Sequence, residues 1–206
     1  MDGRLIGRRQ ALSGLAGFCA SAYLPSNWAT TGSDTASSGF WQRAREGGCI
    51  LLMRHGVTVA GVGDPPNFRL GDCSTQRNLS EAGREASRQL GKRFVAERIP
   101  LAAVYSSAWC RCLDTARLAF DPHYPAHQIW PALNSFFQGQ GDRDRQTRDV
   151  LLRAATLRAP ANWMLVTHQV NITALTGTVP AMGEVFLTRF DPTQSDRLTL
   201  LERLGA

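Results

Sequence analysis

Apolar residues recur along this chain with two periods, one typical of helices and one of strands. Residue 80 is a serine suited to cap a helix, and after it every fourth position from residue 82 to residue 94 is apolar. These positions are Ala82, Ala86, Leu90 and Phe94. The spacing predicts an amphipathic helix over residues 80–97, and a similar apolar face predicts a second helix over residues 142–157.

Short apolar runs separate these helices and have the length of strands. Residues 51–53, 101–104 and 162–167 are such runs, and each leads into a turn and a helix-like segment, the last of which should stop at Gly177. Two closing strands are expected over residues 184–190 and 197–201. This alternation predicts an α/β fold, a three-layer α/β/α sandwich with a largely parallel central sheet.

The N-terminal segment is predicted to be an export signal rather than part of the folded domain. Arg8 and Arg9 precede an uncharged run over residues 11–24, too short to span a bilayer, and the segment resembles a twin-arginine export signal. We expect the signal over residues 1–29, with cleavage after Ala22 or Ala29, a linker over 30–45 and one domain over 46–206. The protein should then be periplasmic, without stable membrane insertion; the alternative is an ordinary cytosolic tail.

Composition and charge narrow the classes of partner. The chain is 43% hydrophobic and 19% charged, as in globular proteins, and its formal net charge is +6. A moderately basic surface suits anionic substrates. No recognition motif or basic stripe interleaved with aromatic residues accompanies the charge, so nucleic acid is not expected as a partner.

Four cysteines remain once the signal is removed, and an oxidising compartment would favour pairing among them. They are Cys49, Cys73, Cys110 and Cys112. Cys110 and Cys112 lie two apart on a predicted helix and should point in different directions, so they should not pair with each other. Cys73 with either of them is the favoured disulfide. No histidine is spaced to complete a metal site, and neither metal nor cofactor is expected.

Arginine and histidine follow three of the predicted strands. Arg54 and His55 end the first strand ahead of Gly56, Arg111 lies early in the helix after the second, and His168 follows the third. Ligand sites of α/β sheets lie beyond the carboxyl ends of strands, so these side chains should converge. They suit phosphoryl chemistry, with an imidazole as nucleophile and guanidinium forks around the phosphoryl oxygens. For attack His55 must be neutral, and its other ring nitrogen should donate to a backbone carbonyl.

At these residues the chain resembles the histidine phosphatase superfamily, also called the phosphoglycerate mutase-like family. The matching stretches, in the family's order, are residues 51–56, 79–90, 105–116 and 165–177. The resemblance implies a phosphoglycerate mutase-like fold. It also implies that His55 is phosphorylated, that Arg54 and Arg111 bind the phosphoryl oxygens, and that His168 hydrogen-bonds the same group.

One part of the family's usual chemistry is missing. Asn134 stands where many members have a glutamate acid, and Gln169 stands where another branch has an aspartate. Asp72 is the main substitute that we consider, and the other candidates are Asp64, Asp142 and Asp144. Alternatively, the leaving group needs little protonation. Thr58 and Arg77 are expected to contact the substrate.

The leading hypothesis is an exported, metal-independent phosphomonoesterase that acts through phospho-His55 on a small-molecule or macromolecular phosphomonoester. A phosphoglycerate mutase-type phosphotransferase is an alternative, although the stretch between Arg111 and His168 is short for a cap. A cytosolic phosphohistidine-protein phosphatase is favoured by the missing acid and opposed by the signal. Outside enzymes, the chain could be a catalytically silent phosphate-binding module.

Overall fold

A six-stranded sheet forms the centre of the computed structural model, which describes residue 3 and residues 31–205. The strands are β1 (Ile50–Arg54), β2 (Leu101–Ser106), β3 (Gln128–Ile129), β4 (Asn162–Thr167), β5 (Val185–Phe190) and β6 (Leu198–Leu204). Their order across the sheet is β3-β2-β4-β1-β5-β6. The pairs among β1 to β4 are parallel, whereas β5 is antiparallel to both β1 and β6. The largely parallel sheet is therefore confirmed.

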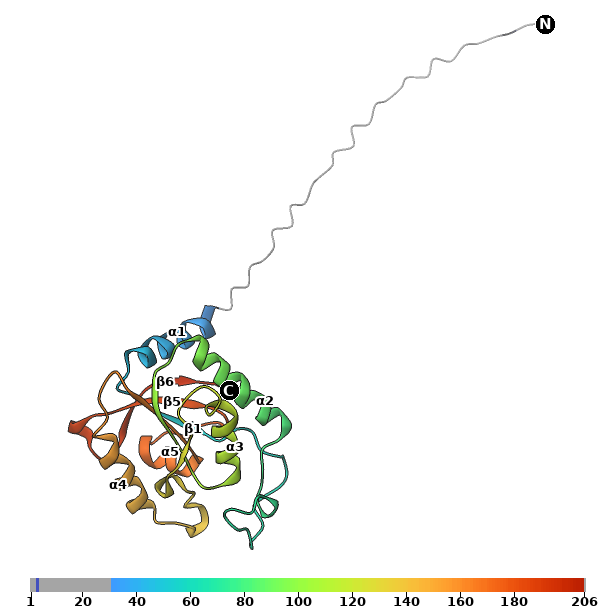
Figure 1. Ribbon diagram of the computed structural model, residues 1–206. Helices are drawn as coiled ribbons and strands as arrows, with labels where there is room; N and C mark the ends of the chain where they lie inside the picture. Colours follow the sequence, from blue (N-terminus) through green and yellow to red (C-terminus); the bar gives the residue numbers. More distant parts are fainter. Residues whose placement is uncertain (1–2, 4–30, 206) are drawn as a thin grey trace. The chain divides into compact units, whose positions relative to one another are not determined.

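Helices cover both faces of this sheet (Figure 1). They are α1 (Thr31–Glu46), α2 (Glu81–Ala96), α3 (Cys110–Ala119), α4 (Arg143–Ala154) and α5 (Gln169–Thr176). Alternate residues of β1 enter two separate cores, as expected of a strand buried on both faces. Leu51 and Met53 pack with α1, α2 and α3, while Ile50 and Leu52 pack with α4 and α5. The three-layer α/β/α arrangement is as predicted.

The helix ends follow local chemistry. The Ser80 hydroxyl accepts a hydrogen bond from the Gly83 N–H at 3.0 Å and so caps α2, as the sequence predicts. Gly83 also lets α2 approach the chain after β1, since a Cβ there would collide with the Val57 carbonyl. Gly177, at φ 74°, ends α5 in the left-handed conformation. Helix α4 ends three residues before the predicted 157, where Thr156 Oγ1 donates to the Arg153 carbonyl.

The predicted linker over residues 30–45 is wrong for the part that the structure describes. Residues 31–46 form α1, and Phe40, Trp41 and Ala44 are buried. The Trp41 ring meets Phe94 of α2 edge-on, with ring centroids 5.1 Å apart. A serine- and glycine-rich composition conceals this short apolar stripe, so the folded domain begins before residue 46.

The proposed export signal over residues 1–29 lies outside the described residues, apart from Gly3. Within the described part, no helix is both long and apolar enough to cross a membrane.

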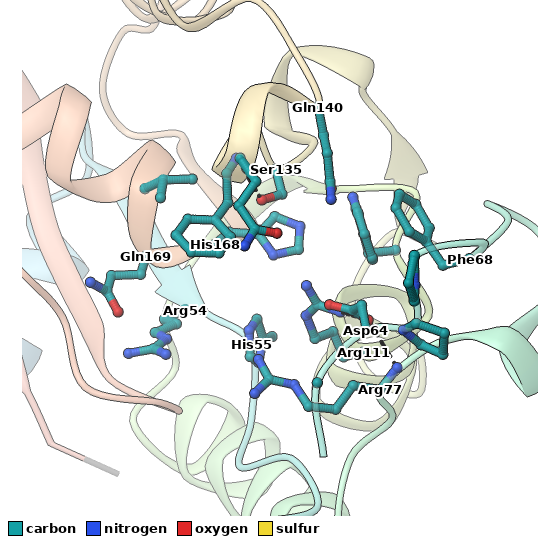
Figure 2. Close-up of a pocket in the computed structure, with 17 residues that line it drawn as sticks. Arg54, His55, Asp64, Phe68, Arg77, Arg111, Ser135, Gln140, His168 and Gln169 are labelled. Carbon is teal, nitrogen blue, oxygen red and sulfur yellow. Dashed lines mark hydrogen bonds and ion pairs between the residues drawn. The ribbon is translucent and has the colours of Figure 1, made fainter. Parts of the chain in front are cut away.

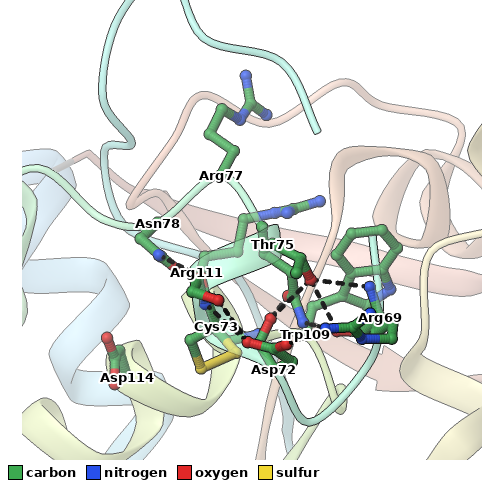
Figure 3. Close-up of a disulfide and its surroundings, with 12 residues drawn as sticks. Arg69, Asp72, Cys73, Thr75, Arg77, Asn78, Trp109, Arg111 and Asp114 are labelled. Atoms are coloured by element: carbon green, nitrogen blue, oxygen red, sulfur yellow. Dashed lines mark hydrogen bonds and ion pairs between the residues drawn. A yellow bond between two sulfur atoms is a disulfide. The ribbon is translucent and has the colours of Figure 1, made fainter. Parts of the chain in front are cut away.

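One disulfide ties the loop between β1 and α2 to the first turn of α3 (Figure 3). It joins Cys73 to Cys110, one of the two pairings favoured by the sequence, with the Cα atoms 5.6 Å apart. Cys49 and Cys112 are buried free thiols. Because Cys110 precedes Arg111 in the chain, the bond anchors the loop directly beside a predicted phosphate ligand.

Candidate active site

A cavity of about 380 Å³ lies at the carboxyl ends of β1 and β4 and is lined by Arg54, His55, Arg111 and His168 (Figure 2). Backbone pairing sets their relative positions. The His55 N–H donates to the Thr167 carbonyl at 3.0 Å, which ties the end of β1 to that of β4. The four residues predicted from separate stretches of sequence are therefore brought together in one pocket.

His55 is held as a buried, neutral imidazole. Its Nδ1 lies 2.9 Å from the Gly56 carbonyl oxygen. A carbonyl can only accept, so Nδ1 carries the proton and Nε2 keeps its lone pair. Burial, followed by the nearby Arg111 charge, lowers the pKa of His55 to about 3. The backbone contact expected from the sequence is confirmed, and the imidazole is unprotonated at neutral pH.

A hydroxyl that the sequence analysis missed supports the second histidine. Ser107 is fully buried, and its Oγ lies 2.8 Å from His168 Nε2 and 3.1 Å from Asn134 Oδ1. Ser107 donates its one hydroxyl proton to Asn134 Oδ1, so its oxygen accepts a hydrogen bond from His168 when Nε2 carries the ring proton. Asn134 Oδ1 also accepts from the Ala108 N–H at 2.8 Å. The residue at the expected position of the acid thus positions Ser107 and its neighbour.

Three guanidinium groups give the pocket an excess of positive charge. Arg54 donates to the Pro180 carbonyl at 2.9 Å, Arg111 donates to Asp64, and Arg77 lines the pocket beside them. In the described part of the chain, the Nε atom of each of these arginines is buried without a hydrogen-bond partner. Burial, and then repulsion from Arg77 and Arg111, lowers the pKa of Arg54. A bound phosphoryl group would relieve this repulsion and supply acceptors.

Two predicted site residues do not reach the pocket. Thr58 is buried against Met182, and its hydroxyl contacts the sulfur at 3.6 Å, so it is not placed to bind substrate. Asp72 lies outside the cavity, where it pairs with Arg69 at 2.6 Å (Figure 3). Hydrogen bonds from Ser74 and Arg69 lower the pKa of Asp72, which is the wrong direction for an acid. Asp72 as the general acid is therefore a wrong prediction.

Asp64 is the one carboxylate among the described residues that line the cavity. Its Oδ1 accepts from Arg111 at 3.0 Å and from the Arg77 backbone N–H at 2.9 Å. Asp64 thus anchors Arg111 and the pocket loop. The other two candidates lie elsewhere: Asp142 caps α4, with its Oδ1 3.0 Å from the Arg145 N–H, and Asp144 is exposed in the first turn of that helix.

Loop residues that follow no periodic pattern form the outer wall of the pocket. They come mainly from the loop between β1 and α2 and from the segment between β3 and α4. They include Phe68, Ser135, Phe137, Gln138 and Gln140. Trp109 and Gln169, which directly follow or precede predicted elements, also line the pocket. For Trp109 and Gln169, the place near the end of a predicted strand is the only sequence signal that could have indicated a role in the pocket.

The depressed pKa of His55 predicts a specific acid sensitivity. An unfolded histidine titrates near 6.5, whereas folded His55 stays neutral down to about 3. As pH falls through this window, the unfolded chain takes up a proton that the folded state does not, so stability is lost. Between pH 7 and pH 5, His55 should remove about 2 kcal/mol from the free energy of unfolding.

Urea unfolding of wild type and His55→Gln at both pH values measures this contribution. The variant should lose about 2 kcal/mol less than wild type between pH 7 and pH 5. Equal losses in the two proteins would contradict the neutral, buried state of His55.

Comparison with known proteins places this geometry in a family. The model of the histidine phosphatase superfamily (branch 1) matches residues 50–149. The structure of the protein histidine phosphatase SixA complexed with tungstate has a TM-score of 0.55 at 16% identity, covering 76% of this chain and 96% of that one. A putative alpha-ribazole-5'-P phosphatase from Escherichia coli has a TM-score of 0.55 at 18% identity, covering 78% and 97%. No curated protein matches the chain.

Bacillus stearothermophilus YhfR has a TM-score of 0.53 at 18% identity, covering 75% of this chain and 95% of its own. At such identities the structural likeness establishes the fold. The family match over residues 50–149 includes the segments that carry Arg54, His55 and Arg111. The segment over residues 50–149 therefore belongs to the histidine phosphatase superfamily.

Proposed function

We propose that the protein is an exported phosphatase that needs no metal and acts through a phosphohistidine at His55. Nε2 of His55 attacks phosphorus, the bond to the leaving atom breaks, and that atom departs with the electron pair. Water then attacks the phosphohistidine, which releases inorganic phosphate and restores the imidazole. Arg54 and Arg111 supply positive charge to the equatorial oxygens in both steps.

The observation that carries this proposal is the state of His55. The Nδ1 contact with Gly56 directs the lone pair of Nε2 away from the backbone, in a pocket shared with two buried arginines. A neutral imidazole next to fixed positive charge is suited to attack a phosphate dianion. Guanidinium groups do not ligate cations, and no cluster of three residues with metal-binding side chains occurs in the described part of the chain.

The same pocket favours leaving groups that need no proton from the protein. Asp64 accepts two hydrogen bonds through Oδ1 and donates none. Phosphoramidates are one such substrate class, so a phosphohistidine phosphatase is a second candidate, and the resemblance to SixA supports it. A mutase is less well supported, because the segment between α3 and α4 forms only β3 and two short 3₁₀ turns rather than a cap.

A series of leaving groups tests the proposal. Without acid catalysis, log kcat/KM should fall steeply as the leaving alcohol becomes less acidic, so that aryl phosphates far outpace alkyl phosphates. We expect Asp64→Asn to change the absolute rate but to leave this slope as steep as in wild type. Asp72→Asn is the matched control outside the pocket and should leave the rate within twofold.

Two outcomes of the series would contradict this proposal. If Asp64 is the acid, wild type will show a shallow slope, and Asp64→Asn will slow alkyl esters by about 10²–10⁴ while sparing aryl ones. A protein that binds phosphate but turns over no ester in the series would be a silent binding module.

Export is supported by the twin arginines and by the disulfide, a bond typical of oxidising compartments. We expect the native protein in the periplasmic fraction to begin after Ala22 or Ala29 and to carry one disulfide. Intact-mass measurement before and after reduction, with N-terminal sequencing, checks both features. A cytosolic protein that keeps Met1 and has Cys73 and Cys110 reduced would refute the proposed export.

A further inference from the structure

We propose that the outer pocket is a subsite for an uncharged aromatic group, formed by Phe68 on one loop and Phe137 on the other. The substrate would then be a phosphate ester or amidate whose leaving atom is attached to, or part of, a flat ring. This inference rests on the proposed function only for its catalytic consequence, because binding to the subsite can be measured without turnover.

The charge of the pocket limits what the rest of the substrate can carry. Three arginines and one aspartate are the charged residues that line it, so the formal charge is three minus one, or +2, with both histidines neutral. A phosphate monoester brings nearly two negative charges at neutral pH. Its phosphoryl group therefore balances the pocket, and no cation remains for a second phosphate or a carboxylate.

One aromatic wall is already assembled in the structure. Phe68 stacks on Trp109, with ring centroids 4.3 Å apart and planes inclined by 28°. Trp109 is only 2% exposed, and the Arg111 guanidinium lies 4.4 Å from its ring centroid. Figure 2 shows Phe68 beyond Asp64 and Arg111, on the side of the pocket away from Arg54. The wall thus begins next to the phosphate ligands and extends outward.

The second aromatic side chain is unusually exposed. Phe137 is 58% exposed, yet it lines the same cavity. Its loop continues with Gln138 at φ 55°, a conformation uncommon for a residue other than glycine and often found at ligand sites. The amide of Gln140 reaches into the cavity from this segment (Figure 2). An aromatic ring in this space would cover Phe137 and meet an amide at its edge.

The chemistry of the pocket points to the same class. With no proton donor, only an acidic leaving group departs readily, and phenols and protonatable ring nitrogens are far better leaving groups than alkyl alcohols. Flat rings also gain from stacking, by about 2- to 13-fold in affinity per aromatic pair. A small aryl phosphate and a phosphorylated aromatic side chain of a protein share these properties.

Two phosphonates of equal charge and nearly equal size test the subsite without any reaction. Benzylphosphonate and cyclohexylmethylphosphonate place a CH₂ where the ester oxygen would be, and they differ in whether the ring is flat. By calorimetry, wild type should bind the benzyl compound about 2- to 13-fold more tightly. Phe137→Leu, which keeps an apolar side chain at an exposed position, should reduce this preference, and Phe68→Leu is a second test. Leu152→Ala on the exposed face of α4 is the control and should retain the preference.

Equal affinity for the two phosphonates in wild type, or a preference that survives both phenylalanine substitutions, would overturn the subsite. Hydrolysis of phenyl phosphate separates this result from the proposed function. Turnover without aromatic preference would support the phosphatase function and contradict the subsite. Aromatic preference without turnover would support the subsite and contradict the phosphatase function. Comparing phenyl phosphate with a phosphotyrosyl peptide then distinguishes the two sources, and preferential cleavage of either supports the subsite.

Discussion

Replacing His55 with alanine should abolish hydrolysis of an aryl phosphate, with a loss of about 10⁴-fold or more. The reaction would lose its nucleophile, while the arginines would still bind phosphate. Chelation with EDTA should leave the wild-type rate unchanged. Steady-state kinetics measure the loss, and the intact mass of wild type quenched in base during turnover should show one added phosphoryl group.

The exposed His123→Ala serves as the matched control and should keep wild-type activity. Binding of inorganic phosphate to His55→Ala shows whether the pocket survives the substitution. Substantial turnover by a folded His55→Ala protein, or inactivation by EDTA, would rule out the phosphohistidine mechanism without metal.

Arg111→Ala is expected to cause the second-largest loss of activity, and two separate causes contribute to it. Removing one preorganised donor to a developing negative charge costs about 10²–10³ in kcat. The substitution also leaves Asp64 without the guanidinium that lies 3.0 Å from it, so that a carboxylate faces the incoming phosphate. We therefore expect a total loss in kcat/KM of about 10³ or more.

The double variant Arg111→Ala/Asp64→Asn separates the two losses. It should recover at least about tenfold in kcat/KM relative to Arg111→Ala, because it removes the uncompensated carboxylate. Arg117→Ala, exposed on the same helix, is the control and should change kcat/KM less than twofold. If the double variant is no more active than the single one, Asp64 does not oppose phosphate, and its pairing with Arg111 has no part in the site.

The disulfide shows how local patterns limit a choice that tertiary packing makes. The sequence leaves Cys73 free to pair with either Cys110 or Cys112. In the structure Cys110 meets Cys73, whereas Cys112 turns inward, 3.5 Å from His168 Nε2. Side chains two positions apart on a helix point in directions that differ by about 200°. The orientation of α3 on the sheet therefore decides which of the two cysteines meets the loop.

The candidate acids show the same limit more sharply. Asp64 and Asp72 both lie in the loop between β1 and α2, and nothing in their local sequence distinguishes them. The fold brings Asp64 into contact with Arg111 and leaves Asp72 paired with Arg69 outside the cavity. Thr58 was similarly expected at the substrate and lies against Met182 instead. Side chains on irregular loops have no period that reveals their direction.

By itself, the sequence determined the layers of the fold and the core of the site. Apolar periodicity marks α2, α4 and the strands, and strand ends place Arg54, His55 and His168 at one edge of the sheet, because these signals are local and repeat along the chain. The tertiary structure alone decided the Ser107 contact with His168, the Asp64 ion pair, the aromatic wall and the packing of α1. Each of these depends on segments far apart in sequence that meet only when the sheet and its helices have assembled.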